Sequence, residues 1–349
     1  PHAFREHWVA QQYLPENLKG RVFYQPGEQG AEELIKNQVL RRRELQLEAV
    51  FEEHQTVEVL TNSPPDSNRD EWLMRAAGQN SETLEVLRES LIKKLRLQRN
   101  HVVLDINSGT GLLGWEIIRQ TPEGGVWMHE KNSNRAKILE QMATHLNKID
   151  RPVILCSPLS KIKDQIKEHV SSIRYNAICG RNVLCMESDK KSIVKTIADY
   201  IAPGGRIAIS ENILYLSQRL YKLADLKLKK NDLFNRVAEA EEAIYQRSTN
   251  PHLAYSEVDL QSIFLEAGFK SVGVERQSLK FQRYITKKDI DTWFSAGNNT
   301  QPTYAYHLSK SLELEDINSL HEVFLEDLVK KNVTWTTNRA LIFARAGDK

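Results

Sequence analysis

The chain of 349 residues has little of several features that mark particular classes of protein. Its three cysteines, Cys156, Cys179 and Cys185, are too few and too scattered for a disulfide framework, and none has CxxC zinc-site spacing. No apolar run approaches the roughly 18 residues of a membrane-spanning helix. The formal net charge of +2 predicts no generally basic surface, although a local nucleic-acid patch needs only a local excess of charge. We therefore expect a protein of the reducing cytoplasm, without a membrane span or a metal site.

The chain also lacks a Walker A loop, GxxxxGK[ST], so we expect no ATPase activity from it. What it does have is 27% charged and 40% hydrophobic residues, which is typical of a globular protein. Its length fits one large domain, or one domain with an appendage. Because it begins with Pro1 rather than methionine, we expect it to be a piece of a longer protein.

The opening third combines an irregular segment with a helix. Residues 1–30 are dense in aromatic residues, proline and glycine, whereas the apolar spacing of residues 31–53 predicts an amphipathic helix. Three consecutive arginines, 41–43, lie in that helix, and we favour a solvated helix face for them over a phosphate contact. The polar, proline-rich stretch 61–71 predicts a loop or hinge.

The segment "HWVAQQYLPENLKGRVFYQPGEQGAEELI" resembles the C-terminal tail of the RarA (MgsA) replication-associated recombination ATPases, which are AAA+ proteins of the clamp-loader clade. The stretches "QQYLP", "LKG" and "FYQPGEQG" carry the resemblance. It implies that an AAA+ module precedes this chain in the intact protein, with homo-oligomerisation and DNA contact through that module. Residues 1–55 hold too few apolar side chains for a core of their own. We expect them to pack on the ATPase module or, without it, to lie exposed or fold back on the rest of the chain.

The stretch "VLDINSGTGLLGWEI" (103–117) predicts a buried strand, a glycine loop and a helix. Glycines at 109 and 111 let the backbone turn tightly and bring its N–H groups against a ligand at the helix N-terminus. The spacing is not the GxGxxG of dinucleotide-binding proteins, and a purely structural turn remains the alternative.

The order D-I-N-S-G-T-G resembles motif I of the class I S-adenosylmethionine (SAM) methyltransferases, usually hhD-h-G-x-G-x-G. In that family the loop surrounds the methionine end of SAM, so the resemblance implies that role for Asp105. Asn107 stands where the family has its first glycine, and we expect it to take a positive φ, which asparagine tolerates. The second strand, in "GGVWMHEKN", ends at Glu130, which the resemblance places on the ribose hydroxyls, with an ordinary helix-capping acid as the alternative.

Later segments extend the resemblance. "PVILCSPLSKI" brings Ser157 to the place of an acid that binds adenine, with Pro158 available to pack on the base, and Asn176 replaces another frequent acid. "IADYIAPGGRIAISENI" resembles the L-x-P-G-G-x-h-h-h segment of the family, and "ALIFARA" (340–346) predicts a final strand antiparallel to strand five. The cofactor-binding residues implied by the resemblance are Asp105, Asn107, Ser108, Gly109, Gly111, Glu130, Lys131, Ser157, Pro158 and Arg181.

The residues that would serve the methyl acceptor are harder to identify. Weak candidates are Glu187 after strand four and His252 and Tyr255 in "NPHLAYSEVDL", each with a structural role as the favoured alternative. The Asp/Asn-Pro-Pro-aromatic motif of DNA amino-methyltransferases and the Pro-Cys nucleophile of cytosine C5 enzymes are absent. The stretch 216–246 predicts a helix, which we interpret as a solvated lid.

Together these patterns predict an α/β protein with a Rossmann-like, seven-stranded, mostly parallel sheet and helices on both faces. The expected organisation is a tail (1–55), a linker (56–79) and a methyltransferase domain (80–349) with helical insertions at about 213–255 and 287–335. The expected activity is methyl transfer from SAM, leaving S-adenosylhomocysteine, to an unidentified acceptor. A non-catalytic SAM-binding or interaction module that serves the ATPase is the alternative.

Overall fold

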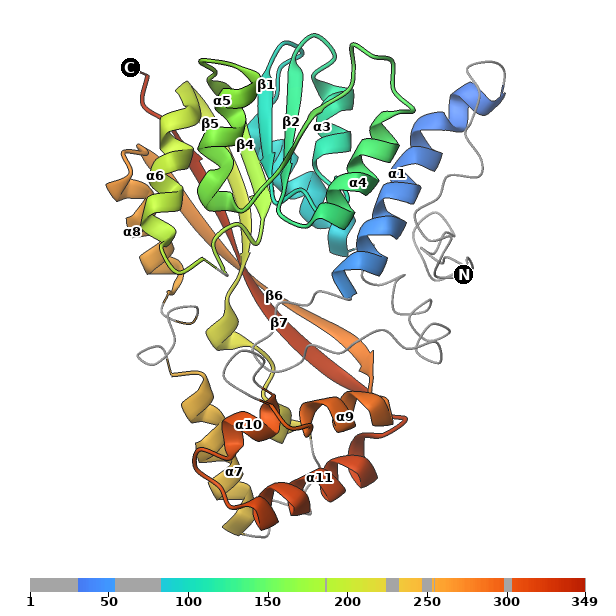
Figure 1. Cartoon of the computed structure of the whole chain (residues 1–349), viewed down its shortest axis with the longest axis vertical. Coiled ribbons are helices and arrows are strands. Elements are labelled where there is room, and N and C mark those ends of the chain that lie inside the picture. The colour runs from blue at the N-terminus through green and yellow to red at the C-terminus, as the bar shows by residue number, and fades with distance from the viewer. Residues whose placement is uncertain are drawn as a thin grey trace.

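The computed structural model describes residues 31–53, 83–185, 187–223, 232–246, 253, 255–297 and 303–348. Its upper part in Figure 1 is a sheet flanked by helices, and its lower part is a lobe of helices. The two strands β6 and β7 run from one part into the other. The predictions for the segment 1–30 and for the hinge at 61–71 concern residues outside the described ones.

One sheet forms the centre of the upper part, with the strand order β3-β2-β1-β4-β5-β7-β6. Neighbouring strands among β1 to β5 pair in parallel, whereas β7 is antiparallel to both β5 and β6. The predicted seven-stranded, mostly parallel sheet with an antiparallel last strand is confirmed. The strands are β1 (Val102–Ile106), β2 (Gly125–Glu130), β3 (Val153–Cys156), β4 (Tyr175–Arg181), β5 (Ile201–Asn212), β6 (Ser271–Tyr284) and β7 (Asn332–Arg345).

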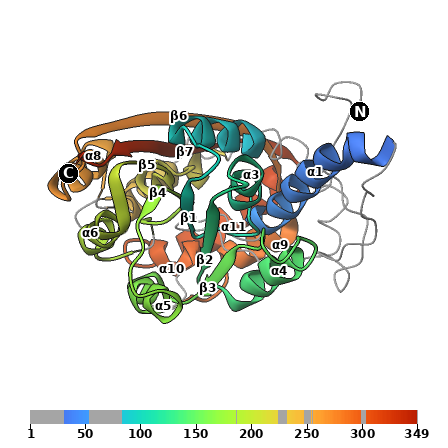
Figure 2. The same cartoon turned by 90° about the horizontal axis from the view of Figure 1, so that it is seen from above.

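Helices cover both faces of this sheet, as the view from above shows (Figure 2). On one face lie the helix of residues 83–95, α3 (Gly114–Gln120) and α4 (Ser133–Ala143), and on the other lie α5 (Ile162–His169), α6 (Lys190–Tyr200) and α8 (Glu257–Glu266). Each face has its own apolar cluster against the almost fully buried residues of β1 and β4. Burial on both faces explains why these strands are continuous apolar runs rather than alternating ones.

Side-chain caps fix where several helices begin. Asn132 accepts hydrogen bonds from the backbone N–H groups of Asn134 and Arg135 at the start of α4, and Asp189 accepts one from Ser192 N at the start of α6. Such caps satisfy N–H groups that have no partner within the helix. The parallel pairing of β1 with β2 and with β4 puts the carboxyl ends of these strands at one edge of the sheet.

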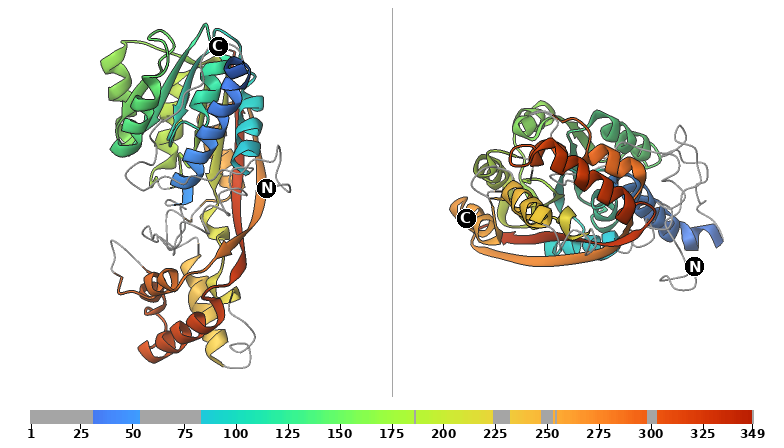
Figure 3. Two further views of the ribbon diagram at one scale, coloured as in Figure 1. Left: turned by 90° about the vertical axis from the view of Figure 1, so that its right-hand side faces the viewer. Right: turned by 90° about the horizontal axis from the view of Figure 1, so that it is seen from below.

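The lobe consists of α7 (Asp232–Ile244), α9 (Lys287–Trp293), α10 (Tyr304–Leu308) and α11 (Leu314–Leu328), packed on the far ends of β6 and β7 (Figure 3). Its core contains Trp293, Trp335, Tyr304 and Phe324, all essentially inaccessible to solvent. The regions predicted as insertions, about 213–255 and 287–335, thus contribute to one common core.

The predicted helix over 216–246 is wrong over residues 216–223, while residues 224–231 lie outside the described part of the chain. The short 3-10 turns η4 (Leu214–Leu216) and η5 (Leu220–Lys222) occupy the beginning of this stretch, and the α-helix begins only at Asp232, after residues that the structure does not describe. Glu241 of α7 accepts hydrogen bonds from the backbone N–H groups of Leu220 and Tyr221, so the turn folds back onto α7 instead of continuing it. Tertiary hydrogen bonding has overridden helical propensity here.

Among the helices in the described ranges, none combines the length and the apolar character needed to cross a bilayer.

Candidate cofactor site

The candidate site lies where the parallel strands β1, β2 and β4 end, and the glycine loop after β1 forms its centre. Three residues of this loop have positive φ: Asn107 at 57°, Gly109 at 65° and Gly111 at 94°. The expectation that Asn107 would take a left-handed conformation in place of a glycine is confirmed. The loop is closed by a hydrogen bond from Gly111 N to Ser108 O.

Asn107 also connects the loop to the end of β4. Its Nδ2 donates to the backbone oxygens of Arg181, at 2.7 Å, and Asn182, at 3.3 Å. A glycine, the usual family residue, has no side chain to make either bond. The asparagine therefore connects the loop to the end of β4 by contacts that a glycine cannot form. Its Oδ1 is buried and has no hydrogen-bond partner among the described residues, so this acceptor is available to a ligand.

Asp105 is almost completely buried at the end of β1, beside Cys179 of β4. Its Oδ2 accepts a hydrogen bond from Gly114 N at 3.1 Å, and its Oδ1 lies 3.6 Å from the Cys179 thiol, which donates to it. Burial raises the pKa of this carboxyl to about 7, and the nearby charge of Glu48 contributes in the same direction. Asp105 therefore positions the start of α3 as well as facing the loop.

Glu130, at the end of β2, reaches the same loop. Its Oε2 accepts a hydrogen bond from Gly109 N at 2.9 Å, and its Oε1 accepts one from Asn132 N at 2.9 Å. The guanidinium of Arg135 lies 3.6 Å away, and burial raises the pKa of the Glu130 carboxyl. The structure thus brings together the two acids that the sequence had placed at the ends of successive strands.

The other predicted cofactor residues have varied surroundings. Lys131 and Pro158 are exposed, and Ser108 donates through its hydroxyl to Asp105 O at 2.9 Å. Ser157 is buried, and its Oγ has no hydrogen-bond partner among the described residues. An unpartnered buried hydroxyl at the place expected for adenine is a group that a bound ligand would satisfy.

Asn176 has a structural explanation. It lies at the start of β4, and its Oδ1 accepts a hydrogen bond from Val102 N at 2.8 Å. The side chain joins the beginnings of β1 and β4, at the edge of the sheet opposite the glycine loop. Its departure from the family pattern therefore concerns the scaffold.

Two site residues were missed by sequence reasoning, and both belong to α1 (Ala31–Glu53), which lies beside α3 (Figures 1 and 2). Glu48 accepts hydrogen bonds from Thr110 N at 2.9 Å and Thr110 Oγ1 at 2.6 Å, and it forms an ion pair with Arg181 at 2.7 Å. Glu44, one turn earlier, forms an ion pair with Arg119 at 2.7 Å. The two glutamates are four residues apart, with buried leucines between them. This spacing places both carboxylates on one face of a helix, and it was the signal that the sequence offered.

The helix predicted over residues 31–53 is confirmed as α1, but part of its surroundings was not predicted. Arg41, favoured as solvated, is bonded to both oxygens of Glu116 on α3, each at 2.9 Å, although its side chain is still 47% exposed. Arg119 bridges Glu116 and Glu44, and Arg88 lies 3.6 Å from Glu44. This helix of the predicted tail is therefore folded back on the sheet domain. The division of the chain at residues 55 and 79 stays a prediction.

The two acceptor-side candidates that the structure describes, Tyr255 and Glu187, are held by separate contacts. Tyr255 is buried, its hydroxyl donates to Asn212 O at 2.8 Å, and burial raises its pKa well above the usual range, so it is no base at neutral pH. Glu187 is half-buried in the loop after β4, where its carbonyl oxygen accepts a hydrogen bond from Lys190 Nζ. His252 lies outside the described residues.

Glu211 at the end of β5 was also missed, and it fixes the loop after β4. Its oxygens accept hydrogen bonds from the backbone N–H groups of Val183, Leu184 and Cys185, at 2.7 to 2.9 Å. It is fully buried, and burial raises its pKa to about 7. Three donors converging on one carboxylate hold this loop in a single conformation beside the glycine loop.

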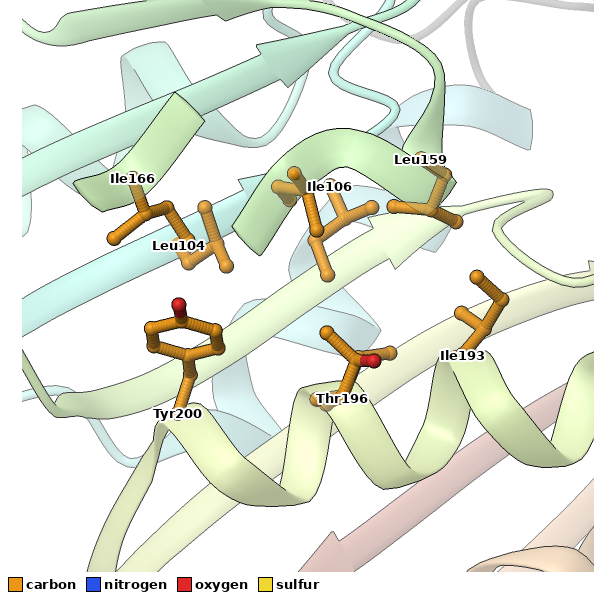
Figure 4. Close-up of a pocket in the computed structure, with 9 residues that line it drawn as sticks. Leu104, Ile106, Leu159, Ile166, Ile193, Thr196 and Tyr200 are labelled. Carbon is orange, nitrogen blue, oxygen red and sulfur yellow. The ribbon is translucent and has the colours of Figure 1, made fainter. Parts of the chain in front are cut away.

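A cavity elsewhere in the sheet domain carries no site. Leu104, Ile106 and Leu159 face Ile193, Thr196 and Tyr200 of α6 across it (Figure 4), and its volume is about 10 Å³. An apolar space of about one water molecule is a packing gap. Among the described residues, no group of three or more His, Cys, Asp or Glu side chains is arranged to hold a metal ion.

Comparison with known proteins agrees with this geometry. A family model described as a methyltransferase domain matches residues 76–274, and one described as the MgsA AAA+ ATPase C-terminal region matches residues 1–43. A search of curated proteins gives no match.

Similar solved structures include the YcgJ protein of Bacillus subtilis, with 12% identity, 76% of this chain and 100% of that chain covered, and a TM-score of 0.44. The cyclopropane synthase MmaA2 of Mycobacterium tuberculosis has 12% identity, coverage of 76% and 85%, and a TM-score of 0.42. A phosphoethanolamine N-methyltransferase of Haemonchus contortus, in complex with S-adenosylhomocysteine, has 12% identity, coverage of 75% and 52%, and a TM-score of 0.40. The methyltransferase model matches more than half of this chain, and the matched part includes the glycine loop. The chain therefore belongs to the methyltransferase domain family, and it is a methyltransferase.

Proposed function

We propose that this chain transfers a methyl group from SAM to an acceptor held between the sheet and the helical lobe. One observation carries the proposal: Glu130 at the end of β2 accepts the hydrogen bond of Gly109 N in the loop after β1. This contact brings the ribose-binding acid and the glycine loop of the family motif to the same place at the carboxyl edge of the sheet, where ligands of open α/β sheets bind.

The described residues fit the cofactor. Glu130 is assigned to the ribose hydroxyls and Asp105 to the methionine end, while the unpartnered Ser157 Oγ is assigned to the adenine edge. Pro158 is exposed and available to pack against the base. When bound, SAM supplies a methyl group activated by its sulfonium.

The residues of this chain then have to bind and orient the acceptor, because positioning supplies most of the rate of such a transfer. The loop that Glu211 fixes, residues 183–185, stands next to the glycine loop and is assigned to the acceptor side. No described candidate has the surroundings of a base, so we assign none.

The match of residues 1–43 supports a second part of the proposal. In the intact protein this segment follows a RarA-like AAA+ ATPase module, through which the protein forms oligomers, contacts DNA and serves replication and recombination. The scattered cysteines favour the cytoplasm as its location.

Calorimetric titration of the chain with SAM and with S-adenosylhomocysteine tests the proposal. We expect both to bind in the micromolar range, and no heat or thermal shift at millimolar ligand would contradict a cofactor site. The alternative is a non-catalytic SAM-binding module. Binding without any formation of S-adenosylhomocysteine on incubation with DNA, RNA or protein acceptors would favour that alternative.

A further inference from the structure

The carboxylate of Glu48 occupies the glycine loop from the side of α1. Only 5% of Glu48 is exposed, and both of its oxygens are bonded. Oε2 accepts from the backbone N–H and the hydroxyl of Thr110, and Oε1 pairs with the guanidinium of Arg181 at 2.7 Å. Glu48 is thus held by a set of donors that belong to the loop and to the end of β4.

These donors are of the kind that recognises a carboxylate. A backbone N–H, a hydroxyl and a guanidinium converge on one negatively charged group, which is how proteins bind free carboxylates as well as internal ones. The methionine end of SAM carries a carboxylate, and this loop is the part of the proposed site that faces the methionine end. The cofactor and Glu48 therefore need the same donors.

The space beside Gly109 of the loop is also too small for both the Glu48 carboxylate and a ligand. A Cβ placed on Gly109 would lie 2.7 Å from Glu48 Oε1 and 2.9 Å from Oε2, so the Glu48 carboxylate is in direct contact with the backbone of the loop. No ligand atom fits between the loop and α1 at this point while Glu48 is in place. The two other carboxylates of the site, Asp105 and Glu130, also experience its charge, which raises the pKa of each.

We propose that Glu48 is an internal competitor of SAM: its carboxylate takes the place of the methionyl carboxylate, and SAM binds when α1 withdraws it. This inference rests on the proposed cofactor site. Withdrawal makes the groups of Thr110 and Arg181 that now bind Glu48 available to the cofactor, at the cost of unpairing Glu48, which then becomes solvated.

Ion pairs between α1 and α3 oppose this withdrawal. The MgsA-type match ends at residue 43, within α1, and Glu44 and Glu48 follow immediately on the same helix. Ion pairs from Arg41 to Glu116 and from Glu44 to Arg119 hold α1 against α3. A change that weakens these pairs would therefore favour withdrawal of Glu48 and tighten SAM binding.

Titration of SAM into the unmodified chain and into the variants Glu48→Gln and Glu48→Ala tests the proposal. If the competing contact is populated nine times in ten, its removal tightens the apparent Kd roughly tenfold. The matched control is Glu140→Gln on the neighbouring helix α4, an exposed glutamate that should leave the Kd unchanged. Hydrogen exchange of the unmodified chain, read by mass spectrometry, provides a measurement without any substitution: saturation with SAM should speed exchange in residues 44–53.

The outcomes separate this inference from the proposed function. SAM binding by the unmodified chain with the same Kd in both Glu48 variants, or with unchanged exchange in α1, overturns the competitor and leaves the cofactor site standing. Weaker binding in both variants also overturns it, and identifies Glu48 as a ligand of the SAM ammonium. Failure of SAM to bind any of the proteins overturns the cofactor site, and the competitor falls with it.

Discussion

The sheet domain and the helical lobe each contain a fully buried glutamate that accepts hydrogen bonds from backbone N–H groups of another segment. In the sheet domain Glu211 holds the loop at Val183, Leu184 and Cys185, and in the lobe Glu241 holds Leu220 N and Tyr221 N together with the hydroxyl of Tyr304 at 2.6 Å. Burial raises the pKa of both carboxyls to about 7. The chemistry of the two anchors is the same.

What they anchor differs. The Glu211 loop lies beside the glycine loop at the carboxyl edge of the sheet, where it bears on the proposed acceptor, whereas the Glu241 contacts close the lobe on itself. A buried carboxylate therefore does not by itself indicate an active site. Its function depends on the segment whose backbone it binds.

The largest expected effect comes from removing these anchors. Glu211→Ala and Glu241→Ala should each lower the free energy of unfolding by about 4 kcal/mol, because several buried donors lose their acceptor. Chemical denaturation measures the loss, and Glu239→Ala, an exposed glutamate on α7, is the control, expected to change stability by less than about 0.5 kcal/mol.

Hydrogen exchange distinguishes the two regions in the same variants. Glu211→Ala should speed exchange at 183–185, and Glu241→Ala at 220–221. If each variant speeds exchange equally in both segments, the two glutamates do not stabilise separate regions, because the sheet domain and the lobe then unfold as one cooperative unit.

Next in size is the effect of Glu130→Ala on cofactor binding. Unpairing a buried charged group should weaken SAM binding by roughly 1–3 kcal/mol. Titration calorimetry measures it, with Glu241→Gln as a lobe control whose affinity for SAM should be that of the unmodified chain. An unchanged Kd in Glu130→Ala would remove the assignment of Glu130 to the ribose.

The pH dependence of stability should be shared by both regions. Asp105, Glu211 and Glu241 have folded pKa values of about 7, above those of the unfolded chain, so the folded state keeps protons that the unfolded state releases. Their contribution to stability is therefore fully present below about pH 4 and falls as the pH rises to about 7. His129, whose pKa burial lowers to about 4, acts in the opposite direction, losing stability as the pH falls from about 6.5 to 4.

Comparison of Asp105→Asn with the unmodified chain isolates one of these groups. The variant should become more stable relative to the unmodified chain as the pH rises from 4 to 7, by up to about 1.4 kcal/mol per pH unit, the limit for one proton. Urea denaturation at a series of pH values measures this slope. A difference that does not change with pH would mean that Asp105 is ionised throughout.

The smallest effect is expected at Asn107. Asn107→Gly keeps the positive φ but loses the bonds to the Arg181 and Asn182 carbonyl oxygens, so we expect a loss of about 1 kcal/mol or less in stability. Asn107→Ala loses the same bonds and adds left-handed strain of about 1 kcal/mol. Thermal melting of the two variants measures the difference, and equal melting temperatures would show that the strain at this position is negligible.

The sheet domain could be predicted because its signals are local. The apolar run at 102–106, the glycines at 109 and 111 and the acid at 130 each fix a strand, a turn or a strand end within a few residues, and the structure shows each of them there. The lobe could not be predicted in the same detail. The helix predicted over 216–246 failed at residues 216–223, because the contacts from Glu241 to Leu220 and Tyr221 that decide this segment join residues some twenty positions apart.

The sequence by itself determined the family, the order of the strands along the chain, the helix of residues 31–53 and the two acids at the glycine loop. Apolar periodicity and glycine positions are properties of neighbouring residues, so they can be recognised directly in the amino-acid sequence. Only the tertiary structure decided that α1 folds onto α3 and that Glu48 enters the loop beside Arg181. The pair Glu48–Arg181 spans 133 residues, and its formation depends on which surfaces exclude water when the whole chain is packed, which no local pattern records.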